Sequence, residues 1–506
     1  MNFLIYADDF YQVYKRGVAN YGFNLIKSLK KENHKVFIYS RGESDLSKKQ
    51  LRSISNRIAF SNELLKEIVY YGKYSLKIKK INKYKLFFKR IYFNLASILS
   101  INSLIKYESI DLHFNSIDDY PSWDGFYNDK FFRFKAYYAE KFKTPLKFRV
   151  PKSIDYVISI SPQNLKVIGA PLISIFHDAL PISSPHHLEE DSKKATMRFN
   201  SAIKNSSKIL HVSEITKKDI EFIFSKQLKK KNSTFSKHVG QSILSELDIE
   251  NFNKLFENYE KSSYYVNSSI SPVSNFVESE VKIPYVVNIG AIEPRKNQDN
   301  LIKHLQPLLK ERKIRLALIG KPAEGGYYSK VKKMIDDINA FDSFVQVRER
   351  NDYRDLKIYK KGKRKDKISK LDLKPYKPII CLQNLNNWEV NYVLQGALCL
   401  VQYSSSEGFG IPLVEACKNT CPVICSDIEI FKEVGSFINI DRNDPRSLIQ
   451  QILFLLNQDL GSRKEIILKQ FKSVKKHSYS SYNEKFFKKC KEIENNNNFF
   501  KRIFSL

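Results

Sequence analysis

The chain is constrained most by a repeated alternation of short apolar runs with longer segments of helical periodicity. Nearly continuous apolar runs are typical of strands buried on both faces of a parallel sheet, with helices as the connections. In the first half the pattern predicts strands at Asn2–Ala7, Lys35–Ser40, Asp111–Asn115, Asp155–Ile160, Leu172–Phe176 and Lys208–Val212. Helices are predicted at Val18–Lys30 and Glu189–Asn205. An α/β fold with a doubly wound parallel sheet is expected.

The second half of the chain repeats this arrangement. Its predicted strands are Tyr285–Ile289, Ile314–Ile319, Ser343–Val347, Pro378–Leu382, Leu398–Tyr403 and Val423–Cys425. A chain of 506 residues exceeds one ordinary core, and the polar stretch Asn251–Lys282 is the expected linker. We therefore expect domains over 1–275 and 281–480, with a C-terminal helix or basic tail over 481–506.

The charge is strongly positive, with 85 Lys and Arg against 54 Asp and Glu and a net charge of +31. Such a balance favours an anionic partner: nucleic acid, a phosphate-rich substrate or an acidic membrane surface. Lysines alternate with aromatic residues in an insertion at about 63–107, which suits anionic lipid headgroups. An ordinary pair of surface helices is the alternative there, and the basic stretch 357–377 indicates an exposed loop.

Six cysteines without a framework of spaced pairs indicate a reducing, cytosolic setting. Cys417, Cys421 and Cys425 run from a predicted helix into a strand, which favours core positions over an iron–sulfur cluster. The N-terminal MNFLIYADDF lacks the basic start of a signal peptide, and no run approaches the ~20 apolar residues that span a bilayer.

The stretch SSSEGFGIPLVEA follows the predicted strand Leu398–Tyr403. Gly408 and Gly410 permit close backbone approach by a ligand, and Pro412 is a natural first residue of a helix. The amides at the start of such a helix point at anionic groups, so the stretch predicts a phosphate site.

Two carboxylates flank this turn, with Glu407 in the loop and Glu415 about one turn into the helix. Carboxylates beside a phosphate site are explained if they accept hydrogen bonds from hydroxyl groups. A sugar and a ribose would supply those hydroxyls.

A second candidate loop, GAIEPRKNQDNLIKHL, follows Tyr285–Ile289. Gly290 makes a small turn, and Arg295 and Lys296 precede a helix that Asn297 would cap. Paired cations at a helix start suit a diphosphate leaving group, whose charge grows as the bond to it breaks.

His177 and Asp178 come at the end of Leu172–Phe176. His177 is predicted to handle a proton or bind a hydroxyl, with Asp178 orienting it. His186 and His187 follow, but the spacing of these four residues matches no common set of metal ligands.

Together these motifs resemble the retaining glycosyltransferases of family 4, also called group 1. The resemblance implies the GT-B fold, in which two Rossmann-like doubly wound domains face each other across a cleft. It is strongest from Tyr285 to about Leu456, where Glu407 and Glu415 match the family's E-x7-E signature. The stretch HDALP is similar to that in bacterial mannosyl- and rhamnosyltransferases of O-antigen and exopolysaccharide assembly.

The resemblance implies a role for each motif. Arg295 and Lys296 would bind the donor diphosphate, Glu407 the transferred sugar and Glu415 the ribose, while His177 would contact the reacting sugar. The remaining expected donor-binding positions are Gly17, Gly290, Gly408, Phe409, Gly410 and Ile411.

The implied reaction is transfer of a hexose with retention, without a protein nucleophile, a metal or another cofactor. GDP-mannose is the first candidate donor, and a lipid-linked or growing surface glycan is the expected acceptor. The enzyme would be cytoplasmic, with attachment to the inner face of the membrane as an open alternative. The chain departs from the family in having Arg16-Gly17 where two glycines are common, and in long segments at 71–107, 221–282 and 341–377.

Three other interpretations stay open. A nucleic-acid-binding or other polyanion-binding protein would explain the charge but neither the glutamates nor the glycines at the strand ends. A GT-B phosphorylase or epimerase would keep the fold and change the chemistry. A non-catalytic GT-B protein would explain the altered first loop.

Overall fold

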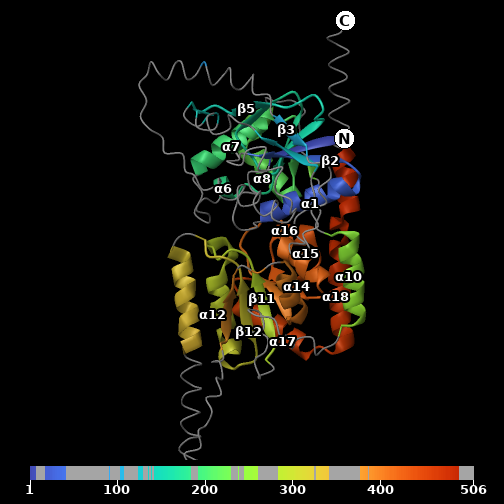
Figure 1. The fold of residues 1–506 in the computed structure, drawn as a ribbon. Helices are drawn as coiled ribbons and strands as arrows, with labels where there is room; N and C mark the ends of the chain where they lie inside the picture. The colour runs from blue at the N-terminus through green and yellow to red at the C-terminus, as the bar shows by residue number, and fades with distance from the viewer. Residues whose placement is uncertain are drawn as a thin grey trace, which may run out of the picture. The chain divides into compact units, whose positions relative to one another are not determined.

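The computed structural model describes residues 1–6, 17–40, 91, 103–106, 124–128, 135, 138–139, 142–183, 192–229, 237–238, 244–259, 283–323, 326–340, 377–383, 385, 387–488 and 490. The chain forms two compact units (Figure 1). The first comprises Met1–Pro185, Glu190–Ser245 and Lys476–Leu506, and the second comprises His186–Glu189 and Glu246–Lys475.

The first unit is built on an 8-stranded sheet of order β10-β9-β8-β6-β1-β2-β4-β3, parallel throughout except for the β3–β4 pair. Its strands are β1 (Asn2–Tyr6), β2 (Lys35–Ser40), β3 (Ser103–Lys106), β4 (Gly125–Asn128), β6 (Tyr156–Ser159), β8 (Leu172–Phe176), β9 (Lys208–His211) and β10 (Lys237–His238). Its helices are α1 (Gly17–Lys31), α6 (Leu180–Ser183), α7 (Ser192–Asn205), α8 (Glu214–Ile223) and α9 (Ser225–Lys229).

The central strands are mostly apolar and are buried on both faces. All residues of β6, β8 and β9 are buried, as parallel strands covered on both sides require. Helix α1 presents one apolar face to the core through Leu25, Ile26 and Leu29. It ends at the left-handed Asn33, whose amide bonds back to the Lys30 carbonyl.

The end of the chain packs against the first unit. Tyr482 lies in a helical segment at 479–488, and its hydroxyl is 2.6 Å from the hydroxyl of Tyr21 on α1. Phe486 is fully buried and stacks on Tyr482 at 5.7 Å. The described part of the expected C-terminal tail is therefore core structure of the first unit.

The second unit is built on a 6-stranded, wholly parallel sheet of order β13-β12-β11-β14-β15-β16. Its strands are β11 (Tyr285–Ile289), β12 (Arg315–Ile319), β13 (Ile379–Leu382), β14 (Cys399–Gln402), β15 (Val423–Ser426) and β16 (Ile438–Ile440). Its helices are α10 (Glu246–Glu257), η4 (Pro294–Lys296), α12 (Gln298–Lys310), a helix at 326–340, α14 (Asn387–Gly396), α15 (Ile411–Lys418), α16 (Glu429–Val434), α17 (Pro445–Asn457) and α18 (Leu460–Val474).

The strand order reverses between β11 and β14. From β11 the chain winds outward through β12 to β13, then returns through α14 to β14 on the other side of β11. Helices α12 and α17 pack together as one layer, and α14 and α18 both pack on α15 in another. In an open parallel sheet, ligands bind beyond the carboxyl ends of the strands at such a reversal.

The strand predictions agree with the structure to within about one residue at each end where the chain is described. The predicted strands 111–115 and 343–347 lie outside the described residues. The two-stranded parallel sheet of β5 (Leu146–Arg149) and β7 (Leu165–Ile168) was not predicted from the sequence. Buried and exposed residues are interspersed in these strands, so they lack the continuous apolar run on which the predictions depended.

The polar stretch 251–282, which was expected to be the linker between the domains, begins inside a helix. Its first residues belong to α10, where Phe252 stacks on Phe471 of α18 at 3.5 Å and 6°. This aromatic pair joins α10 to the second unit, so the compact units divide after Ser245. Residues 260–282 lie outside the described part of the chain.

Candidate functional site

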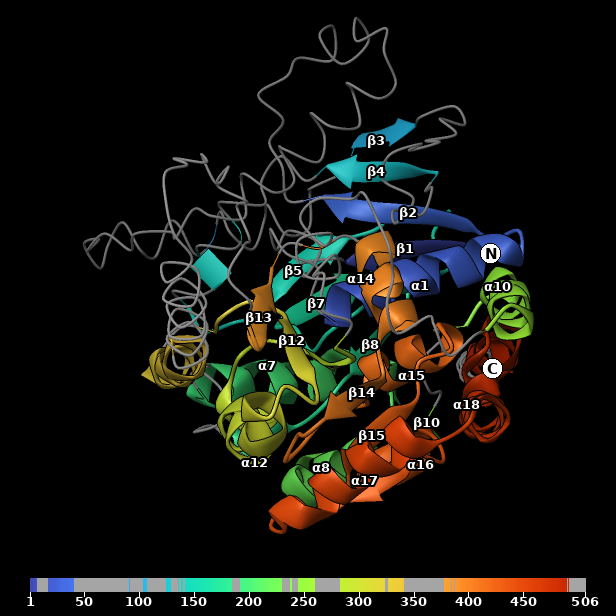
Figure 2. The same ribbon diagram turned by 90° about the horizontal axis from the view of Figure 1, so that it is seen from below.

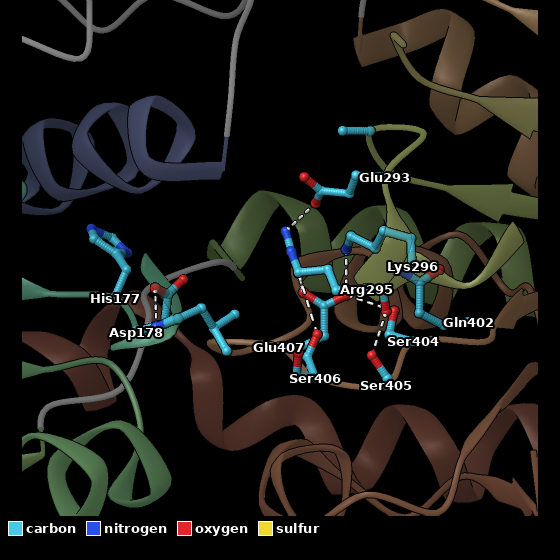
Figure 3. A network of polar contacts seen from close by, with 12 residues as sticks. His177, Asp178, Glu293, Arg295, Lys296, Gln402, Ser404, Ser405, Ser406 and Glu407 are labelled. Carbon is cyan, nitrogen blue, oxygen red and sulfur yellow. Dashed lines mark hydrogen bonds and ion pairs between the residues drawn. The ribbon is translucent and has the colours of Figure 1, made fainter. Parts of the chain in front are cut away.

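The loops after β11 and β14 meet at the reversal of strand order. The Arg295 carbonyl in η4 accepts hydrogen bonds from the Ser405 amide at 2.7 Å and the Ser405 hydroxyl at 3.1 Å. These bonds bring Arg295 and Lys296 against Glu407, as Figure 3 shows. Two motifs that lie more than a hundred positions apart in the sequence thus form one cluster.

Glu407 is the centre of this cluster. Its Oε2 accepts a hydrogen bond from Nη1 of Arg295 at 2.6 Å. Its Oε1 accepts one from the Ser404 hydroxyl at 2.7 Å and another from Nζ of Lys296. Arg295 also forms an ion pair with Glu293, from Nη2 to Oε1, at 2.7 Å. The Glu407 side chain is only 6% exposed, so these contacts replace water as its solvation.

The electrostatics of the cluster follow from burial and pairing. Burial alone would raise the pKa of Glu407, but Lys296, Arg295 and the Ser404 hydroxyl stabilise the carboxylate and lower the pKa to about 2. Burial lowers the pKa of Lys296, and Glu407 offsets part of that effect. Glu407 is therefore ionised at neutral pH and holds two cations in a fixed place beside a helix start.

Gly290 makes room for this arrangement. Its φ is 152°, and a Cβ there would lie 3.0 Å from Cε and 3.3 Å from Nζ of Lys296. The end of β12 comes closer still, since a Cβ on Gly320 would lie 1.9 Å from the Gly290 carbonyl oxygen. Glycine at both positions lets Lys296 and the ends of β11 and β12 come together.

Gly320→Ala is therefore expected to destabilise the protein by about 2 kcal/mol or more, since alanine adds both a backbone clash and strain at φ 154°. Gly326→Ala is the matched control, because no atom beyond its chain neighbours and its own helix backbone lies within 4 Å of the added Cβ, and it should leave stability unchanged or slightly higher. Urea unfolding of both variants measures the difference. Equal stabilities of the two variants would contradict a tight backbone contact at Gly320.

One glycine of the EGFGIP turn, Gly410, has a left-handed backbone conformation. Gly410 has φ 102° and precedes α15, and a Cβ there would lie 2.9 Å from a ring carbon of Phe431. Pro412 is the second residue of α15 after Ile411, where the sequence analysis placed it first. Phe409 is buried.

Glu415 lies in α15 as predicted, partly exposed, and its carbonyl accepts from Nδ2 of Asn419 at 2.8 Å. Asn297 takes the position before α12, but its side chain makes no capping hydrogen bond. The reason is its left-handed conformation at φ 59°, which turns the chain from η4 into α12.

His177 lies at the end of β8 in the first unit. Its Nε2 is 2.7 Å from the Ile160 carbonyl, and its ring packs edge-on against Tyr21 at 4.9 Å. Burial lowers the pKa of His177 to about 4, so the ring is neutral at pH 7. Because a carbonyl only accepts, Nε2 carries the proton and Nδ1 remains the acceptor. These features favour hydroxyl binding over proton donation.

Asp178 accepts a hydrogen bond from the Leu180 amide at 3.1 Å, and the contact that orients His177 comes from Ile160 rather than from Asp178 as predicted. Gly17 is the first residue of α1, and Arg16 lies outside the described residues. His186 and His187 are also outside them.

Among the described residues, no group of three or more His, Cys, Asp or Glu side chains could hold a metal ion. Cys399, Cys417, Cys421 and Cys425 are buried free thiols, and burial raises the pKa of each. In the same part of the chain, no helix has the length and apolar character needed to cross a membrane.

Several residues that build the cluster were not predicted from the sequence. Glu293 lies two positions before Arg295 inside the quoted motif, so its spacing to Arg295 was an available signal. Asn288 and Gln402 were less visible, because each is a single polar residue in an apolar strand. Asn288 donates to the Val401 carbonyl at 2.8 Å and Gln402 to the Ile289 carbonyl at 3.0 Å, which ties β11 to β14.

The second unit matches a known family over most of its length. Residues 273–472 match the family described as glycosyl transferases group 1. This region is a group 1 glycosyltransferase domain. It contains the cluster around Glu407 and the whole EGFGIP turn.

One curated relative is the serotype-specific mannosyltransferase WbdA of Escherichia coli, 31% identical over 128 residues. The match covers 24% of this chain and 16% of that protein, so the chain spans a small part of its relative's length.

Solved structures resemble the whole chain in fold. One is the trehalose-6-phosphate protein of Escherichia coli bound with UDP-2-fluoro glucose, with TM-score 0.52, 10% identity and coverage of 97% and 99% of the two chains. Another is a UDP-forming trehalose-phosphate synthase of Burkholderia xenovorans, with TM-score 0.52, 9% identity and the same coverage. The GT-B fold expected for the group 1 domain and its partner unit is confirmed as the fold class.

Proposed function

We propose that the chain is a retaining glycosyltransferase that moves a hexose from a nucleotide sugar to a glycan acceptor. One observation carries this proposal. Arg295 and Lys296 form ion pairs with Glu407 at the place where the strand order of the group 1 domain reverses. A fold relative is bound with UDP-2-fluoro glucose, which supports a nucleotide sugar as the ligand class.

In this proposal the two cations bind the donor diphosphate. Negative charge grows on the leaving phosphate as the glycosidic bond breaks, and fixed cations stabilise that charge without reorganising. Glu407 orients both cations and accepts from a hydroxyl of the transferred sugar, while Glu415 accepts from the ribose. Neutral His177 accepts from another sugar hydroxyl, and the leaving phosphate takes the acceptor's proton on the same face of the sugar.

GDP-mannose is the first candidate donor, supported by the identity to a mannosyltransferase. UDP-glucose is its rival, because the UDP complex in the same fold supports it. A lipid-linked or growing surface glycan is the proposed acceptor. The net charge of +31 supports a location beside an anionic membrane surface.

A panel of GDP-, UDP- and dTDP-sugars tests the proposal through the thermal unfolding temperature. We expect one donor to raise this temperature, since a ligand that binds only the folded state stabilises it. Pyrophosphate alone should give a smaller shift. If no donor shifts a folded protein while random oligonucleotides bind in a salt-sensitive way, the polyanion-binding interpretation replaces this one.

A further inference from the structure

An exposed aromatic residue in the group 1 domain has no role in the mechanism above. Trp388 is the second residue of α14, and it is 48% exposed, whereas tryptophan is usually largely buried. It follows β13, which runs parallel to β12, β11 and β14. The start of α14 therefore lies beyond the same sheet edge as Arg295 and Glu407.

Hydrogen bonds join α14, the helix that carries Trp388, to α15. The Asn419 side chain donates to Oδ1 of Asn391 at 2.9 Å and to the Glu415 carbonyl at 2.8 Å, which joins α14 to α15. Gln395 adds a bond to Oδ1 of Asn419 at 3.1 Å. Figure 2 shows α14 and α15 close together. Because α14 follows β13 and α15 follows β14 in a parallel sheet, both helices begin at the ligand edge and run away from it.

Trp388 and Glu415 lie on neighbouring turns of these two helices. Trp388 precedes Asn391 by about one turn, and Glu415 precedes Asn419 by about one turn. Side chains in a helix tend to lean toward its N-terminus, so we expect the indole to lean toward the ligand edge. Tyr392, one turn further along α14, packs against the indole edge-on at 6.4 Å and 68°.

We propose that the indole of Trp388 is the surface on which the base of the donor nucleotide stacks. The inference rests on the proposed function, in which Glu415 holds the ribose. The base is joined directly to the ribose, so a ligand held at Glu415 has its base within reach of the adjacent helix. Aromatic stacking accepts any base, so Trp388 supplies affinity for the nucleoside while other contacts select the base.

Tryptophan fluorescence tests this directly, because the chain has only 2 tryptophans, and Trp123 is the other. In the Trp123→Phe variant, GDP or UDP should quench the emission of Trp388 in a saturable way. Pyrophosphate carries the diphosphate without a base, so it should bind without that quenching.

Trp388→Ala should weaken nucleoside diphosphate binding about tenfold or more and leave pyrophosphate binding unchanged. Trp388→Phe should restore most of the affinity, since it keeps a stacking face.

Each result decides the proposal. If a nucleotide raises the unfolding temperature but neither quenches Trp388 nor loses affinity in Trp388→Ala, base stacking is wrong and the donor site stands. Equal weakening of GDP and pyrophosphate in Trp388→Ala would also overturn it, because the residue would then act on the whole loop. If no nucleotide binds the intact protein, the proposed function fails, and the stacking role fails with it.

Discussion

Arg295→Ala is expected to lower kcat/KM for sugar transfer about a hundredfold to a thousandfold, the usual effect of removing one fixed donor to a developing negative charge. Arg295 is held by Glu407 at 2.6 Å and Glu293 at 2.7 Å, so its guanidinium is in place before any ligand arrives. Most of the loss should appear in kcat if the contact strengthens as the leaving phosphate gains charge. Steady-state kinetics with the donor found in the thermal-shift panel measures it.

Two further variants make this result specific. Arg446→Ala removes an arginine from the same unit, but the Arg446 side chain is 84% exposed and should leave the rate unchanged. Arg295→Lys keeps the charge and loses the planar pair of donors, so it should recover only part of the rate. If Arg295→Ala stays folded and transfers sugar at the normal rate, the cation pair is not the diphosphate site.

Glu407→Gln is expected to reduce both turnover and stability. The substitution leaves Lys296 buried without its carboxylate, and breaking a buried ion pair from one side typically costs about 3 kcal/mol.

Glu415→Ala is the comparison within the motif. It should raise KM for the donor with a smaller change in kcat, because its proposed contact is to the ribose.

The stability effect of Glu407 should depend on pH with a definite sign. Its pKa in the folded protein is about 2, below its ordinary value of 4.5, so the folded state favours the ionised form. The stabilisation is therefore complete above pH 4.5 and is lost as the pH falls toward 2. Urea unfolding of the wild type and Glu407→Gln at falling pH should show their difference shrinking over that window. Glu311→Gln is the control, because Glu311 is 55% exposed and paired only at the surface.

The sequence determined the elements that carry the site. Mostly apolar runs predicted β11 and β14, since a strand buried on both faces has no polar side. The glycines and cations that follow these runs predicted the loops of the site. The same criterion failed for β5 and β7, in which buried and exposed residues are mixed. Asn297 was expected to cap α12 by its residue type, but its backbone conformation excludes that hydrogen bond.

Only the tertiary structure decided which loops meet. Glu407 pairs with Arg295 and Lys296 because the sheet order places β14 beside β11, and strand order depends on the packing of whole helices and strands rather than on any local pattern. The return of the chain end to the first unit has the same origin, since Tyr482 and Phe486 find their buried partners on elements at the opposite end of the sequence. Local periodicity specifies each element, whereas contacts between distant elements exist only once both have folded and packed.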